Sequence, residues 1–350
     1  IIICMDLREK VIAKGRLNVS EDIGIDLGTA TVIAYTKGKG IVLREPSVVA
    51  IDRYTNEVLE YGKEAQKMIG RNPHNIDVIR PLKDGVISNF TVTAKMLKHF
   101  IKKSLVKSFF APRVMICVPS QITEVEKRAV IDAAMQAGAK KVYLIEEPVA
   151  AAIGAGIDIS KPSGNLVVDI GGGTTDVAVI SIGGSVVSSS IKIAGNKFDE
   201  AIIKYVKKKY NVLIGERTAE EIKISVGCVY PMESDTFIKV RGRNLETGLP
   251  VEIDISNEEM LKVLLPIAMK IVDCVKTTIE KAPPELVEDI SDKGIYMTGG
   301  GSLLYGMDKL LSESTGINVM IAQDAVSCVA IGTGKALDNL DALDAKSRKQ

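Results

Sequence analysis

The sequence predicts an α/β protein of two related lobes, each a mixed sheet flanked by helices. Two observations lead to this fold class. Short apolar runs rich in β-branched residues alternate along the chain with longer segments of helical period. In addition, one strand–turn–strand pattern occurs twice, once around Asp26 and once around Asp169. With 350 residues, of which 46% are hydrophobic, the chain is long enough to bury two cores of ordinary domain size.

The later copy of the pattern covers residues 165–180 and carries one carboxylate into a triple-glycine turn. An apolar run predicts a buried strand that leads to Asp169, and residues 177–180 predict the returning strand of a hairpin. Glycines lack a Cβ and let successive backbone N–H groups face a polyphosphate, and the hydroxyl of Thr174 extends this row of donors. Asp169 and Asp176 lie where a hydrated Mg²⁺ would need oxygen ligands. The stretch is therefore typical of a phosphate and metal site.

The earlier copy, residues 23–35, again consists of an apolar strand, an aspartate, a glycine-bearing turn and a β-branched return strand. Superposing Asp26 on Asp169 also places Gly28 on Gly171. A single turn of this kind is more often an ordinary hairpin corner, but two copies in register favour two hairpins that face the same phosphates. The predicted phosphate contacts are Gly28, Thr29, Ala30 and Thr31 in the first turn and Gly171, Gly172, Gly173 and Thr174 in the second.

Three further segments fit a nucleotide held between two lobes. Residues 297–304 follow a short apolar strand and are predicted to open a helix that continues through Leu310. Residues 330–334 introduce a last helix whose small side chains suit close packing at a hinge, and residues 124–137 have the spacing of a helix. The residues predicted to approach a base or ribose are Gly299, Gly300, Gly301 and Ser302.

Taken in order, these segments resemble the MreB family, the bacterial actin homologues that determine rod shape, within the actin and Hsp70 ATPase superfamily. The resemblance covers about residues 20–344. It implies an actin-like ATPase fold, which is a ribonuclease H-like duplication with the nucleotide in the interlobe cleft, and it implies ATP and Mg²⁺ as cofactors. The supporting stretches are residues 75–89, 144–156, 213–223, 240–245 and 283–286.

The resemblance also implies roles for single residues. Asp26 and Asp169, on opposite lobes, are the expected Mg²⁺ ligands, and Asp169 is counted with the catalytic residues. Glu147 matches the family's water-orienting carboxylate, with Thr174 as its partner hydroxyl. Glu147 also precedes a proline-initiated helix, where the helix dipole favours a carboxylate in any case. Asp176 stands where we expect glutamate in a rod-shape protein, and its shorter side chain would hold the metal's water shell differently.

Glu220 and Lys223 match the family's ribose and base contacts. Their spacing of three residues in a helical stretch would by itself predict only an ordinary surface ion pair.

The alternating signals also predict how the lobes divide the chain. We expect no low-complexity linker between them, only hinges. The predicted division is a leader at 1–19, lobe I at 20–158 and 325–345 with an insert at about 52–90, lobe II at 159–324 with an insert at about 199–250, and a polar tail at 346–350.

Composition excludes several classes of function. The net charge of +1 leaves no large cationic field to attract nucleic acid. The five cysteines show no Cys-x-x-Cys spacing and the two histidines are isolated, so a metal ion would be bound through oxygen. No Gly-x-x-x-x-Gly-Lys-Ser/Thr motif occurs, which excludes a P-loop ATPase. No apolar run approaches the roughly 20 residues of a spanning helix, and no signal peptide is recognisable, so we expect a cytoplasmic protein.

Two segments nevertheless suggest contact with a membrane surface. Phe109 and Phe110 follow a basic stretch, and the resemblance places them on an exposed loop that dips into lipid. From the sequence alone, packing of both rings at the start of the next strand is an equally good interpretation. Residues 1–17 could form a short interfacial helix, although a disordered leader or a misplaced start site explains the segment as well.

The function expected from the resemblance is that of a cytoskeletal ATPase with slow turnover. Subunits would stack head to tail into filaments, paired antiparallel, on the inner face of the cell membrane and would organise cell-wall elongation proteins. The alternative is a small-molecule phosphotransferase of the same superfamily. That activity would require a second pocket beside the terminal phosphate, for which the sequence offers no candidate residues.

Overall fold

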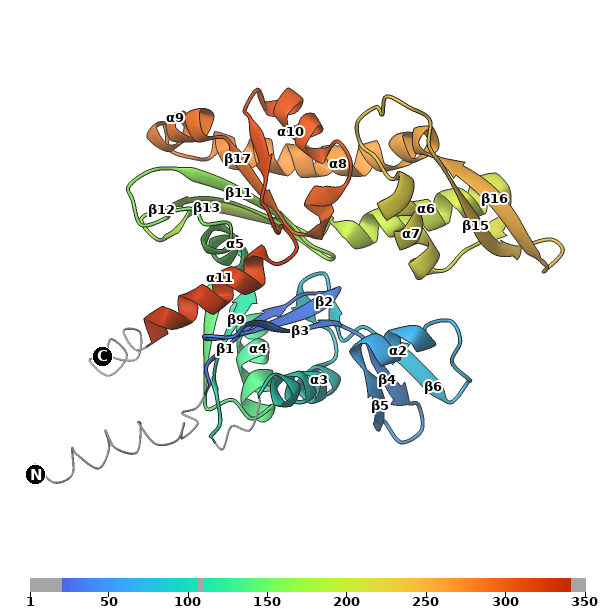
Figure 1. Cartoon of the computed structure of the whole chain (residues 1–350), viewed down its shortest axis with the longest axis horizontal. Coiled ribbons are helices and arrows are strands. Elements are labelled where there is room, and N and C mark those ends of the chain that lie inside the picture. Colours follow the sequence, from blue (N-terminus) through green and yellow to red (C-terminus); the bar gives the residue numbers. More distant parts are fainter. Residues whose placement is uncertain (1–20, 106–109, 341–350) are drawn as a thin grey trace, which may run out of the picture.

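The fold is built on two five-stranded sheets, and each contains one of the two hairpins (Figure 1). The computed structural model describes residues 21–105 and 110–340. In the first sheet β1 (Ile23–Leu27) pairs antiparallel with β2 (Thr31–Thr36) and parallel with β9 (Arg113–Val118). In the second, β11 (Asn165–Ile170) likewise pairs antiparallel with β12 (Thr175–Ser181) and parallel with β17 (Ile295–Thr298). The predicted hairpins, the mixed sheets and their duplication are therefore confirmed.

The first sheet has the strand order β10-β9-β1-β2-β3 and is covered by helices α3 and α4. Its apolar strand residues form one core with the buried faces of these helices, including Met96, Leu97 and Phe100 of α3. The helix predicted at 124–137 is confirmed, because α4 is capped by Thr123 in a reciprocal capping box with Glu126. The remaining elements here are β3 (Gly40–Pro46), α3 (Phe90–Ser104), α4 (Glu124–Gln136) and β10 (Lys141–Glu146).

The second sheet has the order β13-β12-β11-β17-β18, and its core continues into helices α6, α8, α9 and α10. The helix that residues 297–304 were predicted to open, and that was to continue through Leu310, is interrupted. A short 3₁₀ helix, Gly300–Leu303, ends before Gly306, whose φ of 80° breaks the helical path ahead of α10. The elements are β12 (Thr175–Ser181), β13 (Gly184–Ile191), α8 (Asn257–Glu280), α9 (Pro284–Lys293), β17 (Ile295–Thr298), α10 (Met307–Thr315) and β18 (Val319–Ile321).

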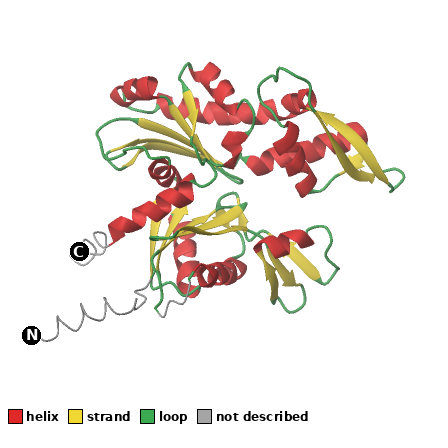
Figure 2. Cartoon of the chain, in the orientation of Figure 1, coloured by secondary structure: helices red, strands yellow, loops and turns green. Residues whose placement is uncertain are grey.

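A smaller sheet extends each lobe at the same end of the molecule (Figures 1 and 2). In the first lobe the strands have the order β5-β4-β6, and in the second β14-β15-β16. The first extension is β4 (Val49–Asp52), β5 (Val58–Tyr61), α2 (Gly62–Met68), β6 (Ile76–Ile79) and the hairpin of β7 (Leu82–Lys83) and β8 (Val86–Ile87). The second is α6 (Gly195–Tyr210), β14 (Val212–Leu213), α7 (Glu216–Val226), β15 (Phe237–Asn244) and β16 (Pro250–Ser256).

Two helices lie between the large sheets and join them: α5 (Glu147–Gly154) and α11 (Cys328–Ala336), which is followed by a 3₁₀ turn, Leu337–Asn339 (Figure 1). They cross so closely that a Cβ on Gly332 would lie 1.7 Å from the carbonyl oxygen of Ala150. The small residues predicted at 330–334 therefore serve close packing, as expected. An apolar cluster built from α5, α11 and both sheets fills the junction. Within the described ranges no helix combines the length and the apolarity needed to cross a membrane.

The close crossing of α5 and α11 can be tested through Gly332. Gly332→Ala should lower the free energy of unfolding by about 1–3 kcal/mol, because overpacking against a rigid helix backbone forces the two helices apart. Gly184→Ala is the matched control, since a Cβ there meets no atom within 4 Å. Urea unfolding of the two variants and the unmodified chain makes the comparison. Equal stability of both variants would contradict the packing described.

Candidate functional site

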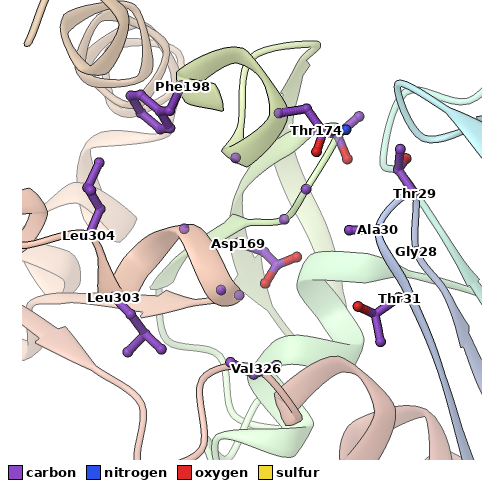
Figure 3. A pocket seen from close by; sticks show the side chains of 18 of the residues that line it. Gly28, Thr29, Ala30, Thr31, Asp169, Thr174, Phe198, Leu303, Leu304 and Val326 are labelled. Atoms are coloured by element: carbon purple, nitrogen blue, oxygen red, sulfur yellow. The ribbon is translucent and has the colours of Figure 1, made fainter. Parts of the chain in front are cut away.

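The two hairpin turns face each other across a single cavity of about 680 Å³ between the lobes (Figure 3). Site residues that were predicted from separate parts of the sequence lie together around this cavity. The role of each single residue remains a prediction. The predicted residues that line the cavity are Asp26, Gly28, Thr29, Ala30, Thr31, Glu147, Asp169, Gly171, Gly172, Gly173, Thr174, Glu220, Lys223, Gly299, Gly300 and Gly301.

Both turns close in the same way. The backbone N–H of Gly28 donates to the carbonyl of Thr31 at 3.1 Å, and that of Gly171 donates to the carbonyl of Thr174 at 2.9 Å. The turns also pack against each other, because a Cβ on Gly173 would lie 2.5 Å from the Thr29 hydroxyl oxygen. A side chain at this position of the second turn would push the lobes apart.

The N-terminus of α6 lies against the triple-glycine turn. The N–H of Gly195 donates to the carbonyl of Gly171 at 3.1 Å, and the N–H of Asn196 donates to the carbonyl of Gly172 at 2.8 Å. Both residues line the cavity, and the sequence analysis missed them. The positive end of a 16-residue helix dipole therefore adjoins the turns, which favours a bound anion. The signal available was a glycine that opens a helix, with three residues between it and the preceding strand.

Carboxyl groups from both lobes crowd the floor of the cavity. Burial raises the pKa of Asp26 to about 6, against a weaker opposing effect of the Cys117 thiol, which donates to its Oδ1 at 3.4 Å. Burial likewise raises the pKa of Asp169 to about 7, although the Thr298 hydroxyl donates to its Oδ1 at 2.7 Å. The pKa of Glu147 is raised well above its usual value by burial and by the other carboxylates. Such a cluster favours the arrival of a cation.

Asp176 does not lie where the sequence analysis placed it, beside a hydrated Mg²⁺. It lies opposite Asp169 in the hairpin register, but it does not line the cavity. It is fully buried, and its Oδ1 accepts a hydrogen bond of 2.9 Å from the backbone N–H of Ser120, at the end of β9 in the other lobe. Its second oxygen, Oδ2, has no hydrogen-bond partner. The shorter side chain thus joins the two lobes behind the site and does not face a metal ion directly.

Asp26 and Asp169 fit a magnesium ion, as opposed to a metal held by protein ligands alone. No group of three or more His, Cys, Asp or Glu side chains in the described part of the chain could hold a metal by itself. Mg²⁺ commonly keeps several waters and binds through one or two carboxylates together with substrate phosphates. Two carboxylates that line one cavity with two phosphate-binding turns match that second pattern.

Lys223 differs from the interpretation as half of a surface pair with Glu220. Its ammonium forms an ion pair of 2.9 Å with Asp199 of α6, and both side chains are largely buried. Glu220 keeps its carboxylate on the cavity wall. Because α6 packs against α7, a partner from another helix replaces the neighbour three residues away.

The glycines at 299–301 were predicted to approach a base or ribose, and two of them are also required by close packing within the protein. A Cβ on Gly299 would lie 2.3 Å from the carbonyl oxygen of Ile170, and one on Gly301 would lie 2.3 Å from its Cγ2. Close packing on β11 therefore requires both glycines, and Gly300 alone meets open space. Ser302 does not line the cavity. It is buried, and its hydroxyl donates to the carbonyl of Gly299 at 2.7 Å.

Apolar side chains that the sequence analysis missed line the wall near Glu220 and Lys223. They are Ile224, Met232, Leu303 and Tyr305. They come from loops and helix ends, where no period marks them, so only the folded arrangement identifies them. Of the two predicted membrane residues, Phe110 is 63% exposed, and Phe109 lies outside the described residues, as does the predicted interfacial helix at residues 1–17.

A family model described as MreB/Mbl protein matches residues 20–345. The chain belongs to the MreB/Mbl family. The cell shape-determining protein Mbl of Bacillus cereus is 56% identical to it over 93% of this chain and 98% of the relative. The cell shape-determining protein MreB of Escherichia coli K12 is 52% identical over 95% and 97% of the two chains. The crystal structure of MreB 5 of Spiroplasma citri bound to AMPPNP superposes with a TM-score of 0.89, at 39% identity, over 94% and 99%.

These comparisons confirm the resemblance and the actin-like fold. The MreB/Mbl chain is a member of a family of actin-like ATPases, and its role is that of a shape-determining cytoskeletal protein.

The raised pKa of Asp169 predicts how pH affects the ligand-free protein. In the folded state Asp169, with its pKa of about 7, keeps a proton up to about pH 7, whereas the ordinary pKa of an aspartate is 3.8. The folded state therefore binds more protons in this window, and the contribution of Asp169 to stability falls as pH rises through it. Asp169→Asn should raise neutral-pH stability by a few kcal/mol and flatten the dependence between about pH 4 and pH 7.

Asp158→Asn is the control of opposite sign. Hydrogen bonds from Ser160 lower the pKa of Asp158 to about 2, so its contribution to stability is lost only as pH falls toward that value. Thermal melts of ligand-free protein across this range compare the variants. The wild-type chain should lose more stability between pH 4 and pH 7 than Asp169→Asn does. An equal or smaller loss would contradict the crowding of carboxyl groups in the cavity.

Proposed function

We propose that the chain binds ATP with Mg²⁺ between its lobes, hydrolyses it slowly and polymerises into filaments that maintain cell shape. One observation carries the proposal: two equivalent hairpin turns, one from each lobe, face one cavity that also contains buried carboxylates of both lobes. A related protein, MreB 5 of Spiroplasma citri, has been solved with AMPPNP, which supports nucleotide binding by this chain.

Different residues would bind the phosphates, the ribose and base, and the Mg²⁺ ion. The turns at 28–31 and 171–174 offer backbone N–H groups and threonine hydroxyls to the phosphates, and the α6 N-terminus adds its dipole. Glu220 and Lys223, with the apolar side chains near them, would bind the ribose and base. Asp26 and Asp169 would hold Mg²⁺, which neutralises charge on the phosphoryl oxygens when bound.

Hydrolysis requires a water molecule in line with the terminal phosphate. Glu147 begins α5 at the cavity floor, where its carboxyl group can orient that water by a hydrogen bond. Thr174 at the end of the triple-glycine turn provides the second contact in this proposal.

Glu147→Ala should lower the rate of ATP hydrolysis by about a hundredfold and leave ATP affinity nearly unchanged, because the residue orients water and does not hold phosphate. Phosphate release and binding of a fluorescent ATP analogue measure the two quantities. Glu146→Gln is the control, because Glu146 accepts a hydrogen bond from Ser185 and does not line the cavity. Equal loss of hydrolysis and binding in Glu147→Ala would remove the assignment.

Membrane attachment through the loop before β9 is part of the proposal. Phe110 is exposed there, and Lys102 and Lys103 precede it at the end of α3. The double substitution Phe109→Ser with Phe110→Ser should reduce co-sedimentation with phosphatidylglycerol-containing vesicles. Phe237→Ser is the matched control, since Phe237 is 64% exposed on the second small sheet. Undiminished pelleting of the double variant would contradict a role of the two rings in membrane binding.

One observation favours the competing phosphotransferase. A second cavity of about 540 Å³ shares Thr29, Ala30 and Thr31 with the first and is lined by carboxylates, among them Asp84. Electron microscopy of the chain with ATP on vesicles separates the two functions. Filaments support the cytoskeletal proposal, whereas ATP consumption that requires an added sugar or carboxylate acceptor supports the phosphotransferase.

A further inference from the structure

The hairpin of β7 and β8 reaches from the small sheet of lobe I to the turns of both lobes. Its two turn residues, Asp84 and Gly85, both have left-handed backbones, with φ of 50° and 78°. This is the geometry of a tight two-residue hairpin turn, which leaves little freedom at its tip. The base of the hairpin is also fixed, because the carbonyl of Pro81 accepts hydrogen bonds from Ser88 and Asn89 at the start of α3.

Gly85 touches both phosphate turns at once. Its N–H donates to the Thr29 hydroxyl oxygen at 2.9 Å, in the turn of lobe I. A Cβ on Gly85 would lie 2.8 Å from Cγ2 of Thr174, in the turn of lobe II, and 2.9 Å from Cγ of Pro119. Real Cβ atoms essentially never approach other atoms so closely, so only glycine fits without displacement of a neighbour. Gly85 also lines the nucleotide cavity.

The side chains that Gly85 touches are poorly able to move. Thr174 is β-branched and strongly restricted about χ1, and the ring of Pro119 is rigid. Thr174 is 8% exposed, so it has little free space into which to turn. Any residue larger than glycine at position 85 must therefore shift the turn that carries Thr174, its hydroxyl included.

We propose that Gly85 is a positioning residue, whose turn fixes the hydroxyls of Thr29 and Thr174 relative to each other and so sets the rate of hydrolysis more than the affinity for nucleotide. The proposal rests on the ATPase function proposed above. It adds to that function a residue from the β7–β8 hairpin of lobe I, outside both phosphate turns.

Gly85→Ala tests the inference in the full-length chain. We expect its kcat for ATP hydrolysis to fall about tenfold to a hundredfold, because small misplacements of positioning groups have effects of this size, while the affinity for ATP stays near the wild-type value. Gly38→Ala is the matched control. Gly38 has the same φ of 78°, so the substitution imposes the same backbone strain, but a Cβ there meets no atom within 4 Å.

Rescue by a conservative change separates positioning from general damage. Thr174→Ser keeps the hydroxyl and removes Cγ2, the atom that a Cβ on residue 85 meets first. The kcat of Gly85→Ala with Thr174→Ser, relative to Thr174→Ser alone, should therefore fall less than the kcat of Gly85→Ala relative to wild type. Absence of rescue, or a kcat for Gly85→Ala equal to that of Gly38→Ala, overturns the inference.

A second variant covers the case in which Gly85→Ala does not fold. In Asp84→Gly the new glycine adopts the left-handed backbone without strain, so the chain should fold. The turn becomes more flexible, so kcat should fall by about twofold or more at unchanged ATP affinity. An unchanged kcat overturns the inference. A wild-type chain that binds ATP but releases no phosphate overturns both this inference and the proposed ATPase. If the wild-type chain hydrolyses ATP and substitution of Gly85 leaves kcat unchanged, the inference alone is overturned.

Discussion

The crowding of carboxyl groups in the interlobe cavity is the constraint on which the rest of the structure depends. Asp26, Asp169 and Glu147 come from both lobes and line one cavity. Burial raises the pKa of each, and repulsion from neighbouring carboxylates adds to the rise for Asp169 and Glu147. Without a cation this arrangement opposes closure of the cleft at neutral pH. A magnesium triphosphate would bring both the metal that the carboxylates require and the anion that the glycine turns and the α6 N-terminus favour.

Close backbone approach keeps these charges together. The crossing of α5 and α11 holds the two sheets at a distance that admits no side chain at Gly332, and the contact between the turns admits none at Gly173. Asp176 adds a hydrogen bond between the lobes behind the cavity. The glycines in this protein therefore serve two purposes, since some leave room for a ligand and others allow two backbone segments to touch.

The sequence predicted the parts of the fold that repeat or have a strong period. The hairpins around Asp26 and Asp169, the mixed sheets and the helix at 124–137 are confirmed because apolar alternation and capping act locally. It failed where distant segments decide the outcome. Gly306 ends a helix that was predicted to continue, and Lys223 finds Asp199 on another helix. Gly85 and Tyr305 reach the cavity only through tertiary packing, for which a single sequence gives no signal.

Calorimetric titration of ATP into the ligand-free chain, with Mg²⁺ and then with the metal chelated, tests the central claim most directly. If the two lobes close around a magnesium triphosphate, ATP should bind with one site per chain, and chelation should weaken binding at least about tenfold, since the carboxylates would then face the phosphates without a cation between them. ATP binding that is unchanged by chelation, or no binding in either condition, would contradict the account.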